Sequence, residues 1–130
     1  MATIKAYLTL IGSNFDSTAV TKVMGILPDS IREKDEVLSN GRFFGHTEWG
    51  IETDEEDGDD IEPVLRKLIN RVEKHTDIMS EISKRFDAEW HLLIFLQIYN
   101  EDAPTIFFPA DIIQFIAQIN AQIGFDTYIK

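Results

Sequence analysis

The side chains best suited to chemistry lie close together, between residues 46 and 62. His46 and Glu48 form an H-x-E pair on a segment with strand character, and Trp49 follows directly. Residues two apart on a strand share one face, so both side chains of the pair address the same space. A zinc-deaminase motif begins this way, but it also needs a downstream pair of cysteines, which this chain lacks. We therefore predict no catalytic residue, and His46, Glu48 and Trp49 become candidates for a binding groove.

An acidic segment overlaps this pair. Residues 48–62 contain nine Asp and Glu residues and no Lys or Arg, in a chain whose net charge is −11. In the calcium loop of an EF-hand, the first and twelfth residues are ligands and the sixth is glycine. With Gly58 as the sixth residue, those two positions are Thr53 and Val64, neither of which supplies a carboxylate. We predict no metal site and interpret the segment as a mobile, solvent-exposed connection, with weak divalent-ion binding as the alternative.

The same charge suggests a docking surface. A dense block of carboxylates attracts a basic protein and speeds its association. The candidate contact residues are Asp54, Glu55, Glu56 and Asp57. Outside residues 48–62 the acids and bases nearly balance, and no basic stripe occurs. Nucleic acid and anionic membranes are therefore not expected as partners.

Apolar periodicity indicates the elements that must position these residues. The expected strands alternate apolar and polar residues or are apolar on both faces: 3–11, a strand or hairpin around Gly45 within 42–53, 88–99, 105–108 and 125–130. The expected helices repeat apolar residues every three or four positions: 17–24, a helix starting near Pro63, 76–86 and 110–123.

The order of these elements, β-α-β-α-β-α-β, predicts an α+β fold. We expect a two-layer sandwich in which helices cover one face of a mostly antiparallel sheet, related to the ferredoxin-like arrangement. The length suits a single globular domain over residues 1–130. The expected core draws on the apolar stripe of several elements: Leu8, Val23, Leu68, Ile94, Leu96, Ile116 and Ile119.

Composition excludes several other kinds of protein. The absence of cysteine excludes disulfides, thiol nucleophiles and zinc–thiolate sites. The stretch MATIKAYLTLIG has the pattern of a strand and lacks the basic and apolar regions of a signal peptide. No apolar run approaches the roughly 20 residues of a membrane helix. We expect a cytoplasmic protein.

The chain also contains the segments YLTLIGSNFDSTAVTKVMGILP, TEWGIET and LLIFLQIYNEDAPTIFFPADIIQFIAQINAQIGFDTYI. They combine a strand followed by Phe-Asp, a short helix that ends in Gly-Ile and a nearby Pro, a Trp on a middle strand, and a final strand, proline, helix and strand. Over nearly its whole length the chain thus resembles the bacterial proteins grouped as domain of unknown function 4279. The resemblance implies a small stand-alone domain with no assigned activity, and it suggests an immunity-like role as one hypothesis.

Two functions remain in competition at this point. The first is a non-enzymatic, protein-binding domain that uses residues 46–62 as an acidic surface for a basic partner. The second is a small ligand-binding protein or enzyme with a pocket near His46, Glu48 and Trp49. A flat acidic face would favour the first, and a pocket with convergent polar groups would favour the second. Neither function requires a cofactor, and the sequence predicts no oligomeric state.

Overall fold

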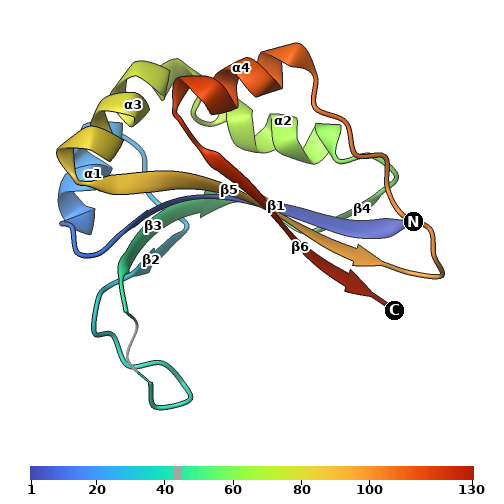
Figure 1. Ribbon diagram of the computed structural model, residues 1–130, viewed down its shortest axis with the longest axis horizontal. Coiled ribbons are helices and arrows are strands. Elements are labelled where there is room, and N and C mark those ends of the chain that lie inside the picture. The colour runs from blue at the N-terminus through green and yellow to red at the C-terminus, as the bar shows by residue number, and fades with distance from the viewer. Residues whose placement is uncertain (43–44) are drawn as a thin grey trace.

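The computed structural model describes residues 1–42 and 45–130, which form a sheet with helices on one of its faces (Figure 1). The strands are β1 (Ala2–Gly12), β2 (Ser30–Arg32), β3 (Thr47–Glu52), β4 (Glu56–Gly58), β5 (Ala88–Ile98) and β6 (Gln122–Ile129). The helical elements are α1 (Ser17–Met24), α2 (Glu62–Asn70), the short 3-10 turn η1 (Glu73–His75), α3 (Thr76–Arg85) and α4 (Ala110–Gln118). The predicted two-layer α+β sandwich is confirmed.

The central strand of the sheet is β1. The strand order is β2-β3-β1-β5-β6, and β4 pairs with β1 beyond the end of β3. β5 runs antiparallel to β1 along its whole length, from Ala2↔Ile98 to Gly12↔Ala88. The one parallel pair among the described strands is β5 with β6, because α4 carries the chain back across the sheet between them. The expected mostly antiparallel sheet is therefore confirmed.

The hydrophobic core lies between the sheet and the helices. Alternate residues of β1, such as Leu8 and Leu10, are at most 1% exposed, because an antiparallel sheet with helices on one side buries every second side chain. Six of the seven predicted core residues are buried, and Val23 is partly buried against the same cluster. The apolar periods were thus assigned to the correct faces.

The first helix begins and ends where its sequence signals predict. The Asp16 side chain accepts hydrogen bonds from the backbone N–H groups of Thr18 (3.0 Å) and Ala19 (3.3 Å), which caps the helix N-terminus. Gly25 follows the last helical residue with φ of +72°, a left-handed conformation in which glycine has no Cβ penalty. This short helix then places Val20 and Met24 in the core.

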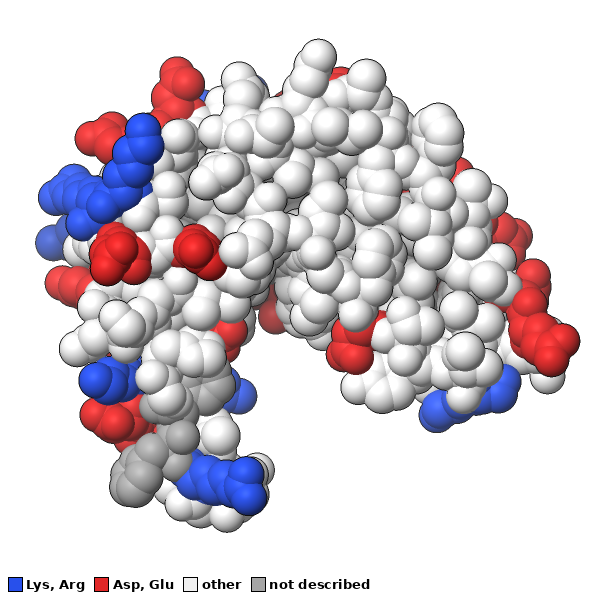
Figure 2. Space-filling model, in the orientation of Figure 1, with Lys and Arg blue, Asp and Glu red and all other residues white. Residues whose placement is uncertain are grey.

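No helix among the described residues covers the opposite face of the sheet, which we call the open face (Figure 1). It carries the alternate residues of the strands, such as Lys5, Tyr7 and Thr9 of β1, which are half-buried. Figure 2 shows that this side is hollowed between segment 33–42 on the left and the ends of β5 and β6 on the right. The fold therefore offers a concave sheet surface on which a ligand or partner can lie.

Several details of the predicted element map were wrong or incomplete. β4 was not predicted, and β6 begins at Gln122, three residues before the expected strand 125–130. Residues 105–108 form no strand, since only Thr105 makes a bridge, to Asp60. α4 stops at Gln118 because Asn120 turns the chain with φ of +53°, so Ile123 belongs to β6 and not to the helix. β2 was not predicted, since three exposed residues give no alternation. Part of the expected hairpin around Gly45, residues 43–44, lies outside the described residues.

None of the helices that the structure describes has the length and apolarity of a membrane-spanning segment.

Candidate functional site

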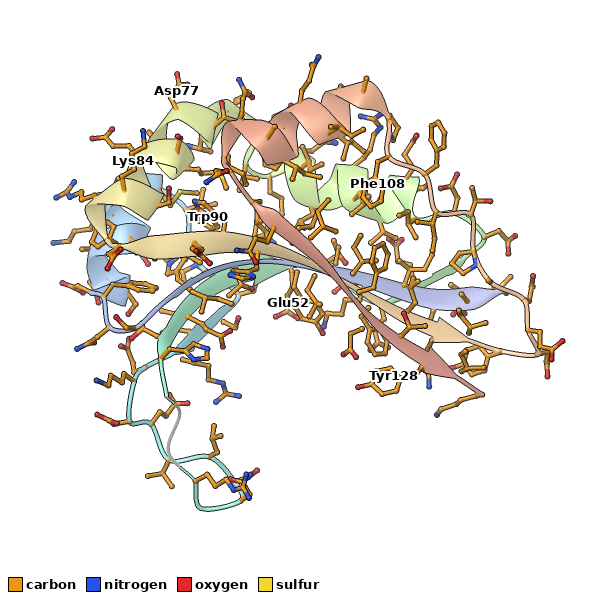
Figure 3. The ribbon with its side chains drawn as sticks, in the orientation of Figure 1. Glu52, Asp77, Lys84, Trp90, Phe108 and Tyr128 are labelled. Carbon is orange, nitrogen blue, oxygen red and sulfur yellow. The ribbon has the colours of Figure 1, made fainter. Side chains whose placement is uncertain are left out.

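A hollow of about 380 Å³ lies on the open face. Residues from four strands line it: Tyr7, Thr9, Ser30, Arg32, Glu48, Glu52 and Leu93. All of them except Leu93 carry a polar group, so the hollow combines charged and hydroxyl groups with one aromatic ring. Figure 3 shows Glu52 on this side of the sheet and Trp90 on the helix side. The sheet thus separates a polar surface from the apolar core.

The H-x-E pair lies at the rim of this region. His46 Nε2 is 3.8 Å from Glu48 Oε1, and their side chains are 42% and 26% exposed. The two residues therefore share a face, as the strand spacing predicts. Glu48 also lines the hollow, whereas His46 does not.

Trp49 does not belong to this site, which corrects the expectation of a groove formed with His46 and Glu48. Its side chain is fully buried on the helix side of β3, and its Nε1–H donates a hydrogen bond to Thr21 Oγ1 at 2.9 Å. The ring meets Trp90 edge to face, with centroids 6.1 Å apart. A strand directs neighbouring residues to opposite faces, so Trp49 packs in the core while Glu48 faces the hollow.

Lys5 and Glu52 form the most enclosed ion pair of the open face. Lys5 Nζ lies 2.6 Å from Glu52 Oε2, with side-chain exposures of 18% and 27%. The same ammonium group sits 4.9 Å from the centre of the Tyr7 ring. The hydrogen bond to Glu52 raises the pKa of Lys5 above its ordinary value, so Lys5 stays charged near neutral pH. One carboxylate of the hollow is thus already neutralised within the protein.

A second hollow, of about 360 Å³, opens at the end of β3, within the acidic segment. Arg71 Nη1 donates to Asp29 Oδ2 at 2.6 Å and to the Glu52 carbonyl at 3.0 Å. Asp29 Oδ2 also accepts the backbone N–H of Glu52 at 2.8 Å. Partial burial raises the pKa of Asp29, but the Arg71 and Glu52 hydrogen bonds outweigh it, so the pKa lies below its ordinary value. These contacts fix the end of β3 against α2.

The acidic segment is tied to the sheet, which corrects the expectation of a mobile connection. Ala6 and Thr53 exchange hydrogen bonds of 3.0 Å, from Ala6 N–H to Thr53 Oγ1 and from Thr53 N–H to the Ala6 carbonyl. Three residues later, β4 pairs with the start of β1, with Gly58 opposite Ala2. The backbone is therefore hydrogen-bonded to β1 on both sides of Asp54 and Glu55, and the segment continues along β1 from β3 to β4.

Several acidic side chains of this segment have internal partners. Glu56 pairs with Lys67 of α2, and Asp57 accepts a hydrogen bond from Thr3 Oγ1 at 3.0 Å. Asp60 accepts the backbone N–H of Glu62 at 2.9 Å, beside the start of α2. In contrast, Asp54 and Glu55 are exposed and make no hydrogen bond or ion pair with any residue that the structure describes. Charge available to a partner is thus concentrated in the short connection before β4.

The described residues contain no group of three or more His, Asp or Glu side chains arranged to hold a metal ion. The candidate loop accounts for this result. The Thr53 hydroxyl oxygen accepts a hydrogen bond from the Ala6 N–H, and Val64 is buried in the core. The two end positions of a calcium loop are therefore occupied by groups that face the protein.

Sequence reasoning missed most of the residues that line these hollows, of which the four that matter most are Tyr7, Arg32, Asp29 and Arg71. Tyr7 carried a usable signal, because it alternates with the apolar residues of the strand 3–11. The other three carried none. Their proximity to β3 depends on β2 and α2 folding back over distant parts of the chain.

The fold and these surfaces define an open-faced, two-layer α+β domain with a polar hollow and an adjoining acidic connection between β3 and β4. The sequence profile of the family described as Domain of unknown function (DUF4279) matches residues 2–130. The chain belongs to this family, as its resemblance indicated. No match was found to a curated protein or to a solved structure.

Proposed function

We propose that this domain binds another protein, without catalysing a reaction, through an acidic surface at residues 46–62. The contact residues are carboxylates of β3, of β4 and of the short connection between them, residues 53–55: Glu48, Asp54, Glu55, Glu56 and Asp57. The observation that carries the proposal is the pair Asp54 and Glu55, which are exposed and have no partner among the described residues. They lie on a short connection whose two ends are hydrogen-bonded to β1.

Rigid attachment makes this charge effective in binding. A partner that docks on a mobile loop must restrict the motion of that loop, which costs binding free energy. The connection between β3 and β4 is already held by Thr53 on one side and by β4 on the other. The unpaired carboxylates are best complemented by Lys or Arg side chains of a basic protein. Because both carboxylates are exposed, their main effect is on the association rate, and salt weakens it.

The test compares two variants with the same change in charge. Asp54→Asn/Glu55→Gln removes the two unpaired carboxylates, and Asp77→Asn/Glu81→Gln removes two exposed carboxylates of α3. Tagged wild-type protein and both variants are used to capture partners from lysate of the native cell, and the captured protein is purified for binding kinetics. The proposal expects slower association only for Asp54→Asn/Glu55→Gln, and the difference in association rate from the wild type should shrink as the salt concentration rises. Equal association rates for all three proteins contradict it.

The hollow of the open face favours a second candidate function, the binding of a small polar ligand. Its volume of about 380 Å³ lies within the range of ligand sites, and Arg32 and Glu48 face it together with the Tyr7 ring. His46 contributes only at the rim and Trp49 not at all. A ligand screen by NMR distinguishes this function, since a true ligand shifts the signals of Tyr7 and Thr9 and loses affinity in Arg32→Gln. A screen that moves no signal of the open face removes this candidate.

A further inference from the structure

β6 forms a long edge of the sheet. In the structure as described it pairs with β5 alone, over eight residues from Gln122 to Ile129. The strands at the other edge, β2 and β4, have three residues each, and two of the β4 residues are acidic. Natural sheets protect their edges with short strands, charges, proline or bulges. β6 contains no Pro or Lys, and Asp126 is its one charged residue.

The surface around β6 is unusually apolar. Seven of the thirteen large, exposed hydrophobic residues among those described lie on β6, on α4 or in the segment just before α4: Ile106, Phe107, Ile113, Ile123, Phe125, Tyr128 and Ile129. Each of them is at least 43% exposed. The rings of Phe108 and Phe125 meet at 6.4 Å, which joins the segment before α4 to the strand, and Figure 3 shows Phe108 beside α4. We call these seven residues the β6 patch.

Charged residues are few in the part of the chain that contains β6 and are concentrated in the acidic segment. Residues 103–130 contain only Asp111, Asp126 and Lys130 as charged groups, whereas residues 48–62 contain nine acids. Figure 2 looks onto β6 and α4, and its centre is white, with the charged residues mostly around the margin. The acidic β4 lies on the other side of β1 from β5 and β6. Pairing of two copies along β6 therefore does not bring β4 of one copy against β4 of the other.

The backbone of β6 is oriented to accept a further strand. Lys130, next after β6, donates its N–H to the Ile98 carbonyl and accepts the Asn100 N–H with its own carbonyl, so it points both groups toward β5. Backbone direction alternates along a strand, so the even-numbered residues of β6 point toward β5. The N–H and C=O groups of Ile123, Phe125, Thr127 and Ile129 then point outward, away from the sheet.

We propose that the protein forms a symmetric dimer in which β6 pairs antiparallel with β6 of a second copy, about a two-fold axis at Phe125. Phe125 then exchanges both backbone hydrogen bonds with its own copy, and Ile123 pairs with Thr127 of the other chain. In this register Asp126 lies opposite Gly124. Centring the axis on Asp126 would set two carboxylates opposite each other, which is destabilising. Centring it on Thr127 would leave fewer strand residues paired.

The size of the patch suits a second copy. Taking about 150 Å² per side chain, the lower end of the range for aromatic residues, seven side chains at roughly half exposure provide about 500 Å² per protomer. The backbone and polar side chains of β6 add to this area, and a standard interface takes about 800 Å² from each partner. A two-fold interface also needs one patch to complement itself, which a largely neutral apolar strand does. The proposal is independent of the acidic surface, which it leaves facing solvent on both copies.

The first experiment measures mass in solution by sedimentation equilibrium from about 1 to 200 μM. The wild type is expected to reach twice the chain mass of 14.9 kDa. Thr127→Pro removes an outward N–H while leaving the β5 ladder intact, and Phe125→Lys places two positive charges at the axis. Both variants should stay monomeric with an unchanged circular dichroism spectrum. Leu27→Lys is the matched control, because it removes a 78% exposed side chain outside the patch, and it should still dimerise.

The second experiment reports on the register. The chain has no cysteine, so single cysteines can be introduced without background. Residues that face each other in a hydrogen-bonded antiparallel pair have Cα atoms about 5.5 Å apart, within the range of a disulfide. Phe125→Cys should form a disulfide dimer under mild oxidation, and Leu27→Cys should not. A monomeric wild type over the whole range overturns the proposal, as does a dimer that persists in both Thr127→Pro and Phe125→Lys. A foreign strand found on β6 of a monomeric protein also overturns it.

Discussion

Arg71 and Asp29, which are 42 residues apart in the chain, are joined by a hydrogen bond of 2.6 Å between guanidinium and carboxylate. Arg71 follows the last residue of α2, and Asp29 directly precedes β2. The same Asp29 oxygen accepts the Glu52 N–H at the end of β3. One carboxylate therefore connects the helix layer to two strands at the entrance of the acidic segment.

Replacing this carboxylate should destabilise the fold. Asp29→Ala removes the acceptor of the Arg71 guanidinium and of the Glu52 N–H, and should lower the free energy of unfolding by about 0.5–1.5 kcal/mol. Asp54→Ala is the control, since its side chain has no partner among the described residues, and should change stability little. Urea unfolding at neutral pH measures both. Equal effects of the two substitutions would show that the Asp29 contacts do not stabilise the fold.

The stabilising effect of Asp29 should depend on pH in a defined direction. Its pKa is lowered in the folded protein, so the folded state favours the charged form. The stabilisation is then complete above the pKa of an unfolded Asp, about 3.9, and is lost as the pH falls through the lower folded value. The stability difference between the wild type and Asp29→Asn should therefore be constant from pH 7 to about 5 and should shrink below about pH 4. A difference that persists unchanged to pH 2.5 would contradict this linkage.

Thr21→Val should reveal the internal role of Trp49. The substitution leaves the buried indole N–H without its acceptor while keeping the shape of the side chain. An unsatisfied buried donor costs about 1–3 kcal/mol, and this loss should appear in urea unfolding. Thr18→Val, an exposed position on the same helix, is the matched control for the change in helix propensity. If both variants lose the same stability, the Trp49 hydrogen bond is not the cause.

Neighbouring residues of β5 should respond very differently to truncation. Ile94 is fully buried, and Ile94→Ala should cost about 2–5 kcal/mol through lost contacts and a cavity. Leu93 lies on the open face with 37% exposure, so Leu93→Ala should cost much less. Chemical denaturation of the pair gives the comparison directly. Similar losses at both positions would mean that the open face is covered in solution, for instance by a partner.

Calcium should not bind tightly to residues 53–64. Neither end of the loop carries a carboxylate, because the two residues are Thr53 and Val64. The Thr53 hydroxyl is also hydrogen-bonded to Ala6, and Val64 is buried. Isothermal titration calorimetry with calcium chloride should give no saturable signal at micromolar concentrations. A dissociation constant below 1 μM would require a rearranged segment and would refute the described structure of β4.

Removal of acidic charge should separate two groups of carboxylates. Asp54→Asn/Glu55→Gln should leave the melting temperature unchanged or slightly higher, because it removes repulsion and no contact. Glu56→Gln/Asp57→Asn should lower the free energy of unfolding by about 0.5–1 kcal/mol, because it weakens the contacts with Lys67 and Thr3. Thermal unfolding at low salt measures both variants. A loss in the first pair as large as in the second would show that Asp54 and Glu55 also stabilise the fold.

The sequence alone predicted those parts of the fold that depend on near neighbours. The alternation of residues 3–11 and the apolar spacing of 17–24 were sufficient, because a side chain's face is set by the local repeat of the element. Even the burial of Trp49 was present in the pattern. The same alternation that places His46 and Glu48 on one face places Trp49 on the other.

Tertiary structure decided what the local repeat cannot express. Contacts between segments far apart in the sequence determine that Arg71 reaches Asp29, that β4 pairs with β1, and that Arg32 lines the hollow of the open face. The sequence of a block of carboxylates does not reveal whether its side chains have partners. Only the three-dimensional structure shows which of them contact Lys67 and Thr3 and which are exposed to a binding partner. The position of β6 at the sheet edge likewise follows from strand order, which depends on packing between elements far apart in the chain.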